Sequence, residues 1–568
     1  EDFFKKSLDL IQKNQGIKNE DYVDSLDSLA DLYYKKGSLS KSAKIYEQAL
    51  KIGAQLYGEN NVNYLLIATG LGQVYSEQGL HKKAEQLLYE IIKKQKLIND
   101  DNIATTFNNL GLLYLEQGLY EKAEEYLFEA LKIDEKIYGY EHKYIAPTIN
   151  NISLNFRDKG ELKKAKKFAL RAIKIYEKEY GKNHPDYANS LSNLALIYQD
   201  DGLYSEAEEL LLKSLTVREN VLGRSHPATG VTLNNLGLNY LLKGINKKAE
   251  PLLLRNLKII KKSFGENHPK TAIALNNLSL IYEDPKQTIP LLKRSLKISK
   301  KIFGENHPST SVAMANLALA YDANGEYEKA ENLLLSSIEI DKNTFGGENI
   351  NFATSLSNLA DIYSRKKEYK KAENLLLEAL SINKKFLNKN HPDISSNYID
   401  LGSLYQKKEL FKNAISFYQK GIEMDHYLIT REVPFIVIGD RMEYISSFKY
   451  GYDQVISLSF EENEGTKLAL NTRLNRQGLL EEIEKRQSQL YNLSKEEKII
   501  AYKINSITQK LSNSNLSFKD KNALTIEKEN LERKLYRLLP KLEPKIINIV
   551  DVAKNLPGNS ILIEYQKY

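Results

Sequence analysis

The chain has 568 residues with a net charge of +7, from 81 basic and 74 acidic side chains, and it contains no cysteine. The lack of cysteine excludes disulfides, thiolate metal sites and a cysteine nucleophile within this chain. Lysine and glutamate alternate without an arginine-rich arm, which favours a solvated surface over a nucleic-acid groove. No apolar stretch approaches the ~18 residues of a membrane span, so we expect a cytoplasmic protein with neither a membrane nor a nucleic-acid partner.

One segment recurs ten times along the chain, after a first helix expected over residues 3–14. Its aromatic anchor returns at Tyr33, Tyr75, Tyr114, Phe156, Tyr198, Tyr240, Tyr282, Tyr321, Tyr363 and Tyr405. The spacing is 42 residues, except for two intervals of 39 that end at Tyr114 and Tyr321. A fixed period of this size predicts a stacked array, in which each unit buries its apolar face on the next. Such an array presents a long binding surface.

Each unit is predicted to be a helical hairpin, as residues 104–146 illustrate. Apolar residues at helical spacing indicate a first helix over 104–117 and a second helix over 120–138. Gly118 lies between them, where a left-handed helix cap is needed and glycine fits without a Cβ clash. The small side chain of Ala123 recurs in most units and should let the two helices approach closely.

A connector of the form Gly-x-x-His-Pro precedes several units. Proline lacks an N–H and has a fixed φ, so it suits the first position of the next helix. The histidines of these connectors are His184, His226, His268, His307 and His391. One histidine per repeat places them roughly 8–10 Å apart along the stack, too far to share an ion. We therefore expect no metal site, and a role for each histidine in ordering its turn.

Two units depart from the pattern. The first unit has Ser42 at the small-residue position, and the unit of Tyr282 has Thr288 there, after a turn shortened to residues 283–286. Both units are expected to pack less well than their neighbours.

The motifs Asn-Asn-Leu-Ala/Gly-x-x-Tyr, Gly-x-Tyr-x-Lys/Glu-Ala-Glu, Ala-Leu-x-Ile and Gly-x-x-His-Pro recur in this order along the array. Together they resemble the 42-residue tetratricopeptide repeats of the kinesin-light-chain type, over residues 1–428. The resemblance implies an all-α fold, a right-handed superhelical solenoid in which the first helix of each hairpin lines a concave groove. It also implies a protein or peptide ligand in that groove, and no cofactor.

Paired asparagines open the anchor motif and are the candidate ligand-binding residues. The first asparagines are Asn108, Asn150, Asn234 and Asn276. The second asparagines are Asn109, Asn151, Asn193, Asn235, Asn277, Asn316 and Asn358. A primary amide donates and accepts at once, so it can pair with a peptide backbone of any sequence. The alternative is that one amide of each pair bonds the neighbouring repeat. We favour the groove for the first asparagines, whereas both roles stay open for the second.

The pattern changes over residues 429–545, where the period stops and long helices are predicted. Capping-box patterns at 494–497 and 517–520 precede two apolar stripes, which predict an antiparallel helical hairpin serving as a spacer. Residues 546–568 differ again, because an apolar run after Leu556-Pro557 predicts the first strand of a sheet. A lone strand is not stable, so we expect the rest of an α/β domain to follow Tyr568.

This order of elements is similar to bacterial proteins that carry tetratricopeptide repeats before a CHAT domain, which has a caspase-like fold. The resemblance rests on residues 431–568 and implies a sensor or regulatory arm of a protease-like protein. Active members use a His and a Cys, but this chain has no Cys and no His after His426. It also lacks a phosphate-binding glycine loop and a nucleophile elbow. We therefore expect a protein-binding scaffold and no enzyme in this chain; the alternative is part of a peptidase whose catalytic domain lies beyond Tyr568.

Overall fold

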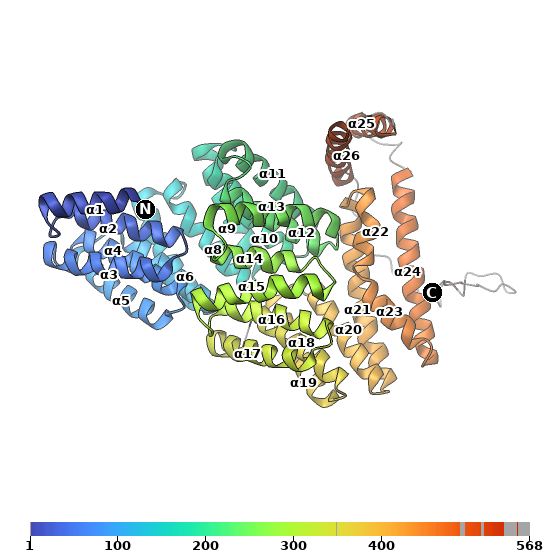
Figure 1. Cartoon of the computed structure of the whole chain (residues 1–568). Coiled ribbons are helices and arrows are strands. Elements are labelled where there is room, and N and C mark those ends of the chain that lie inside the picture. The colour runs from blue at the N-terminus through green and yellow to red at the C-terminus, as the bar shows by residue number, and fades with distance from the viewer. Residues whose placement is uncertain are drawn as a thin grey trace.

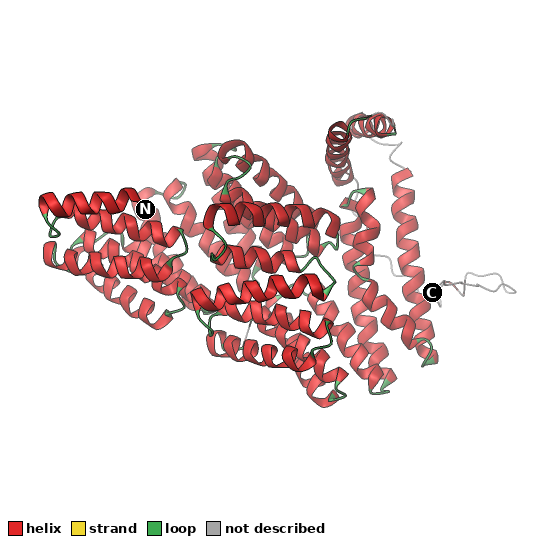
Figure 2. Cartoon of the chain, viewed as in Figure 1, coloured by secondary structure: helices red, strands yellow, loops and turns green. Residues whose placement is uncertain are grey.

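The computed structural model describes residues 2–347, 349–488, 495–512 and 516–538, together with the isolated residues 552 and 554. Every regular element in these ranges is a helix (Figure 2), which confirms the predicted all-α solenoid. None of the described helices is both long and apolar enough to cross a bilayer. The strand predicted within residues 546–568 lies outside the described residues.

After helix α1 (Asp2–Gln15), the described helices α2 to α21 pair as ten antiparallel hairpins, numbered here repeats 1 to 10 (Figure 1). The first, or inner, helices are α2 (Glu20–Lys35), α4 (Val62–Glu77), α6 (Ile103–Glu116), α8 (Ala146–Asp158), α10 (Pro185–Asp200), α12 (Pro227–Leu242), α14 (Pro269–Ser279), α16 (Pro308–Ala323), α18 (Ile350–Arg365) and α20 (Pro392–Lys407). The second, or outer, helices are α3 (Leu39–Leu56), α5 (His81–Ile98), α7 (Tyr120–Tyr138), α9 (Leu162–Tyr180), α11 (Tyr204–Leu222), α13 (Asn246–Phe264), α15 (Pro285–Phe303), α17 (Tyr327–Phe345), α19 (Tyr369–Phe386) and α21 (Phe411–Glu432). Successive inner helices contact one another along the stack.

Each connector histidine directly precedes the first residue of an inner helix. In repeats 5, 6, 7, 8 and 10 the histidine Nδ1 accepts a hydrogen bond from the backbone N–H two residues further, at 3.0–3.2 Å. The proline that follows occupies the first helical turn, where its missing N–H costs nothing. Each of these histidines is thus a helix cap, which confirms its predicted role in ordering the turn.

Small residues bring the two helices of a hairpin together, as the sequence predicts. Gly118 closes the turn of repeat 3 with φ 69°, and Ala123 is fully buried. A Cβ atom added to Gly111 would lie only 2.6 Å from Cγ of Leu127. The shortened repeat 7 differs, because α14 has only 11 residues and Asp284 caps α15 directly.

Successive turns of the solenoid touch at a separation of five to six repeats. A Cβ atom added to Gly37, in the turn of repeat 1, would lie 2.5 Å from Nε2 of His268, which begins repeat 7. In the same way, the carbonyl of Gly202 in repeat 5 accepts a 2.6 Å hydrogen bond from Arg431, at the end of repeat 10. Successive turns of the superhelix therefore touch, and the array is compact.

The chain after the array is helical as well. Its elements are α22 (Ile438–Ser446), α23 (Lys449–Leu458), α24 (Asn463–Ser488), α25 (Lys495–Leu511) and α26 (Phe518–Leu538); single 3-10 turns occur at η1 (Lys143–Ile145) and η2 (Val433–Phe435). Helices α25 and α26 contact each other, as a hairpin would require. The backbone N–H of Asp520 donates to Ser517 Oγ at 3.1 Å, as the capping-box pattern predicts.

Buried charges hold α26 against repeats 5 and 6. Glu208 of α11 lies 2.7 Å from Lys243 Nζ and 2.8 Å from a guanidinium nitrogen of Arg533 in α26. Burial by itself would raise the pKa of Glu208, but these two cations outweigh it and lower the pKa to about 2. Lys248 adds a 2.9 Å ion pair to Glu529. The helices predicted as a spacer therefore pack directly on the array.

Candidate ligand-binding surface

Each inner helix leaves one stripe of side chains uncovered, which we call the inner stripe. It comprises the second asparagine, the residue four positions before it, and the residues three and seven positions after it. On α12 these are Val231, Asn235, Leu238 and Leu242, of which Val231 and Leu242 are 41% and 50% exposed. In this register the second asparagines and the residue four positions after each first asparagine lie on the open face.

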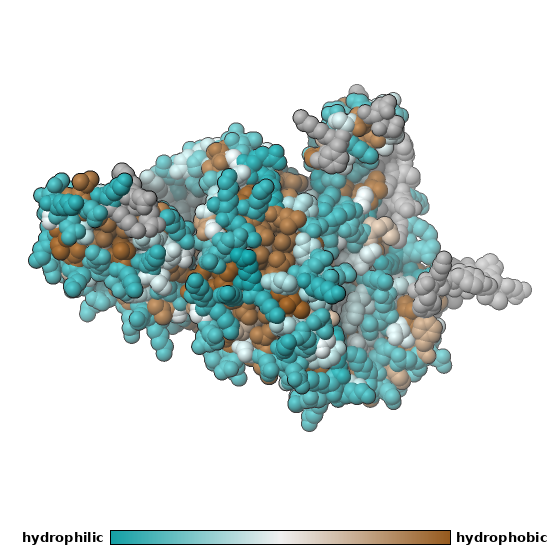
Figure 3. All heavy atoms as spheres, viewed as in Figure 1, coloured by the Kyte–Doolittle hydropathy of each residue, from teal (hydrophilic) through white to brown (hydrophobic). Residues whose placement is uncertain are grey.

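A leucine occupies the same position of the inner stripe in repeats 3 to 8. This leucine ladder consists of Leu112, Leu154, Leu196, Leu238, Leu280 and Leu319. Neighbouring stripe positions add aliphatic surface, and Ile273 is 53% exposed. Figure 3 shows hydrophobic residues gathered over the middle of the visible face, around α12 to α16. The sequence reasoning did not single out these leucines, although their recurrence three residues after each second asparagine was visible.

The first asparagines lie between adjacent inner helices. Their Oδ1 atoms accept hydrogen bonds from the next repeat: Asn151 donates to Asn108 (2.9 Å), Asn277 to Asn234 (2.8 Å) and Asn316 to Asn276 (2.9 Å). Asn150 is only 6% exposed and donates to Ser190 Oγ of the next repeat at 3.1 Å. The structure thus contains the hydrogen bonds between repeats that the sequence analysis gave as the alternative role. Ligand binding by these amides stays a prediction.

The second asparagines are half-buried on the inner stripe, beside the leucine ladder. Asn358 in repeat 9 differs from the bonded amides. Its Nδ2 atom is buried and has no hydrogen-bond partner among the described residues. An unsatisfied buried donor is costly, so Asn358 is the asparagine whose surroundings most clearly leave a bond for a ligand.

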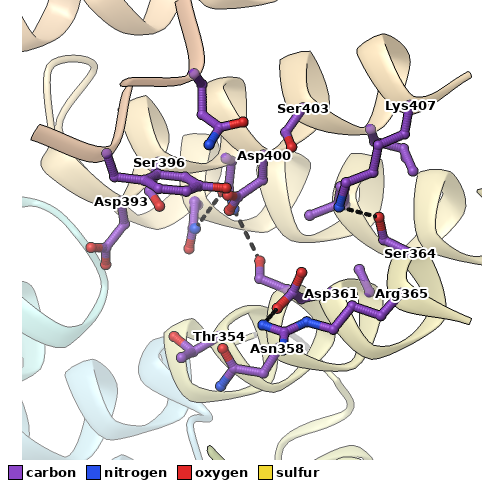
Figure 4. A pocket seen from close by; sticks show the side chains of 18 residues that line it. Thr354, Asn358, Asp361, Ser364, Arg365, Asp393, Ser396, Asp400, Ser403 and Lys407 are labelled. Carbon is purple, nitrogen blue, oxygen red and sulfur yellow. Dashed lines mark hydrogen bonds and ion pairs between the residues drawn. The ribbon is translucent and has the colours of Figure 1, made fainter. Parts of the chain in front are cut away.

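A cavity of about 670 Å³ opens beside Asn358, between α18, α20 and α23 (Figure 4). It continues the inner stripe into repeats 9 and 10, but with polar side chains. Asp361 and Ser403 replace the ladder leucine in these two repeats, and Asp400 replaces the second asparagine of repeat 10. Tyr450 of α23 lines the opposite side. The volume is within the range of small-ligand pockets.

The charges in this cavity are unevenly paired. Arg365 lies 2.8 Å from Asp361, and Lys407 donates to Ser364 Oγ at 3.1 Å. Asp400 has no ion pair among the described residues. Burial raises the pKa of Asp400 to about 7, with a further contribution from the negative charge of Asp361. Burial also raises the pKa of Tyr450 to about 12, helped by the charge of Asp400.

The fold and this surface define an α-helical repeat solenoid with one open stripe on its inner helices. The family described as Tetratricopeptide repeat matches residues 29–96, 102–178, 144–216, 186–253, 283–343 and 351–425, together more than half of the chain. The chain belongs to the tetratricopeptide repeat family, and thereby to a class of protein-binding scaffolds. A comparison with the curated proteins finds no match.

Several solved structures are similar to this chain. A putative kinesin light chain with nearly identical TPR-like repeats from Podosopora anserina is 26% identical, over 36% of this chain and 98% of that chain, with a TM-score of 0.30. BtubC (BKLC) from P. vanneervenii is 23% identical, over 41% and 92%, with a TM-score of 0.32. A Rap protein complexed with Competence and Sporulation Factor is 14% identical, over 64% and 98%, with a TM-score of 0.43.

Proposed function

We propose that this chain is a peptide-binding scaffold whose ligand lies along the inner stripe. The observation that supports this most directly is the leucine ladder, which aligns six leucines with the second asparagines over six consecutive repeats. Contiguous exposed apolar surface with a polar rim is typical of an interaction site. Leucines provide affinity without sequence information, and amides bond a peptide backbone.

The ladder can supply useful affinity. Covering a partly exposed leucine contributes on the order of 1 kcal/mol, which is close to a tenfold change in dissociation constant. Several leucines in one line therefore suffice for a specific complex, even after the ordering of the peptide is subtracted. Because the turns of the solenoid touch at Gly37 and Gly202, we expect an unfolded peptide rather than a folded domain as the ligand.

A selection of random 12-residue peptides against the immobilised chain tests the proposal. Leu319→Gln on the inner stripe should weaken binding of the selected peptides about tenfold. Leu335→Gln is the matched control, because Leu335 lies on the outer helix α17 of the same repeat and is 43% exposed against 39% for Leu319. Equal affinity of the two variants, or a selection that enriches no peptide, would contradict the proposal.

The first asparagines need a separate measurement. Replacing Asn150, Asn234 and Asn276 by alanine removes hydrogen bonds that join repeats. Each such bond contributes about 0.5–1.5 kcal/mol, so we expect the triple variant to melt earlier. A fall in peptide affinity with an unchanged melting temperature would instead assign these amides to ligand binding.

We further propose that the scaffold is the regulatory arm of a CHAT-type, protease-like protein. The support is the order of elements in the sequence, since the array precedes the long helices and the strand motif near Leu556. This chain has no Cys and no His after His426, so it does not itself supply a C-terminal Cys–His pair for such chemistry. A protein that continues past Tyr568 should then show peptidase activity that changes when a selected peptide is added. Peptidase activity that does not change when the peptide is added would contradict the regulatory role and leave the peptide-binding proposal standing.

A further inference from the structure

The cavity in repeats 9 and 10 differs from the rest of the inner stripe in its chemistry. It contains a buried hydrogen-bond acceptor that lacks a donor among the described residues. Asn383 of α19 lines the cavity and is only 3% exposed, yet its Oδ1 has no partner among the described residues. Its Nδ2 is already engaged, because it donates to Asn397 at 2.8 Å. A carbonyl oxygen fixed in this way can accept a bond only from a group that enters the cavity.

Carboxylates supply the second kind of acceptor. Asp393 and Asp400 both line the cavity from α20, and neither is paired with a lysine or arginine among the described residues. Figure 4 shows Asp393 and Lys407 toward opposite ends of the cavity, with Asp400 between them. The cations Arg365 and Lys407 therefore lie toward one end and Asp393 toward the other.

We propose that this cavity binds a basic side chain, lysine or arginine, of the peptide that lies on the inner stripe. The proposal rests on the peptide-binding function and names its charged subsite. An ammonium or guanidinium group offers donors to Asn383 Oδ1 and a positive charge to the two aspartates. The unpartnered Nδ2 of Asn358, at the entrance from the leucine ladder, is then available to a carbonyl of the same peptide.

The opposite choice, an acidic ligand, has less support. Arg365 is already neutralised by Asp361 at 2.8 Å and by Asp322 at 3.3 Å. Lys407 alone would have to hold the anion, against the charges of Asp393 and Asp400. A bound cation in contrast relieves the cost of keeping a half-buried carboxylate without a counter-ion.

Single-residue probes test the site without requiring the leucine ladder. The probes are the N-acetyl, N′-methylamide derivatives of lysine, arginine, norleucine and glutamate, titrated against the full chain by saturation-transfer NMR. We expect the lysine and arginine probes to bind, and the norleucine and glutamate probes to bind at least tenfold more weakly. A norleucine probe that matches lysine, or a glutamate probe that exceeds it, would overturn the proposal.

Variants assign the binding to the named residues. Asp393→Asn combined with Asp400→Asn should weaken the lysine probe at least fivefold, whereas Asp400→Glu should retain it. Asp24→Asn is the matched control, because Asp24 is an exposed carboxylate on the inner stripe at the opposite end of the array. If the double variant does not fold, the single variant Asp400→Asn replaces it. We expect this variant to fold, because asparagine occupies the same position in seven other repeats. Unchanged affinity in a folded variant would contradict the assignment.

The affinity for the lysine probe should also depend on pH. The charged and titratable groups facing Asp400 are Asp361 and Arg365 on α18, Asp393 and Lys407 on α20, and Tyr450 on α23. Because the pKa of Asp400 is about 7 in the free protein, its carboxylate form grows between pH 6 and pH 8, and affinity should rise about tenfold. A flat profile would contradict the role of Asp400.

The outcomes separate this inference from the proposed function. Leu319→Gln should leave the lysine probe unaffected, because the probe does not reach repeat 8. Selected peptides that bind the ladder without enriching lysine or arginine, together with a lysine probe that does not bind, would overturn only the charged subsite.

Discussion

Repeats 3 to 8 and repeats 9 and 10 have the same hairpin but different inner stripes. In the first group the stripe combines asparagine with leucine, whereas in the second it carries Asp361, Asp400 and Ser403. The small residues that pack between the two helices of a hairpin do not change at this boundary. The buried Ala330 and Ala372 lie in equivalent positions on α17 and α19, on either side of this boundary.

This comparison separates two sets of residues within one motif. Positions that face the partner helix are constrained by packing, because small changes in volume there are felt throughout the stack. Positions on the inner stripe are mostly half-buried or exposed, so their side chains can change without altering the packing within a hairpin. The hairpin turns differ as well, since Lys367 and Glu409 have φ values of 63° and 57° where the other repeats, except the shortened repeat 7, use glycine.

The largest effect is expected where the two regions touch. Gly160 in repeat 4 has φ 80°, and a Cβ atom added there would lie 2.3 Å from the carbonyl oxygen of Phe386, at the end of α19. Gly325 in repeat 8 has φ 77° with no atom within 4 Å. Gly325→Ala should cost about 1 kcal/mol for the left-handed backbone. Gly160→Ala should cost about 2 kcal/mol more, because the backbone of α19 must move. Urea denaturation measures both, and equal midpoints would mean that the contact between turns contributes nothing.

The histidine caps are common to both regions, so their removal should cost the same in each. His226→Ala in repeat 6 and His391→Ala in repeat 10 each remove a bond to the second backbone N–H of an inner helix. We expect each to lower the free energy of unfolding by about 1 kcal/mol. Asparagine at the same position should restore the free energy of unfolding, since its side chain also caps helices. A cost confined to one repeat would show that the histidine there acts through another contact.

The half-buried carboxylate of Asp400, in repeat 10, should make the free energy of unfolding depend on pH. Its folded-state pKa of about 7 lies above the value near 4 expected in the unfolded chain. The folded state therefore binds the extra proton, and stability falls as pH rises from about 4 to about 7. Asp400→Asn removes this loss, so it should be more stable than the parent at pH 8, by on the order of 1 kcal/mol. Melting temperatures at pH 4, 6 and 8 should show the gap opening; a constant gap would argue against titration of Asp400.

The smallest effect concerns the hairpin turns of the last two repeats. A non-glycine residue in the left-handed region is strained, so Lys367→Gly and Glu409→Gly should each stabilise the chain by about 0.5–1 kcal/mol. Thermal melting measures the gain. Loss of stability in both variants would show that the lysine and glutamate side chains make contacts that outweigh the strain.

Much of the fold follows from residues whose effects are local. Gly118, Ala123 and the His-Pro connectors predict where each helix begins, turns and ends, and the structure confirms these positions. The role of the asparagine pairs could not be predicted in the same way. Adjacent residues on a helix point about 100° apart, and an amide can bond either a neighbouring repeat or a ligand. Only the bonds such as Asn277 to Asn234 show which use the structure makes of them.

The sequence by itself determined the repeating unit, since capping, turn geometry and helix–helix packing act within about 42 residues that recur along the chain. The tertiary structure determined how successive repeats are arranged in the superhelix. The contact of Gly37 with His268 depends on a small rotation per repeat, summed over six repeats, which no single motif specifies. The cavity around Asp400 likewise exists because α23 lies against repeat 10, and the pKa of that carboxyl is raised by the burial that this packing produces.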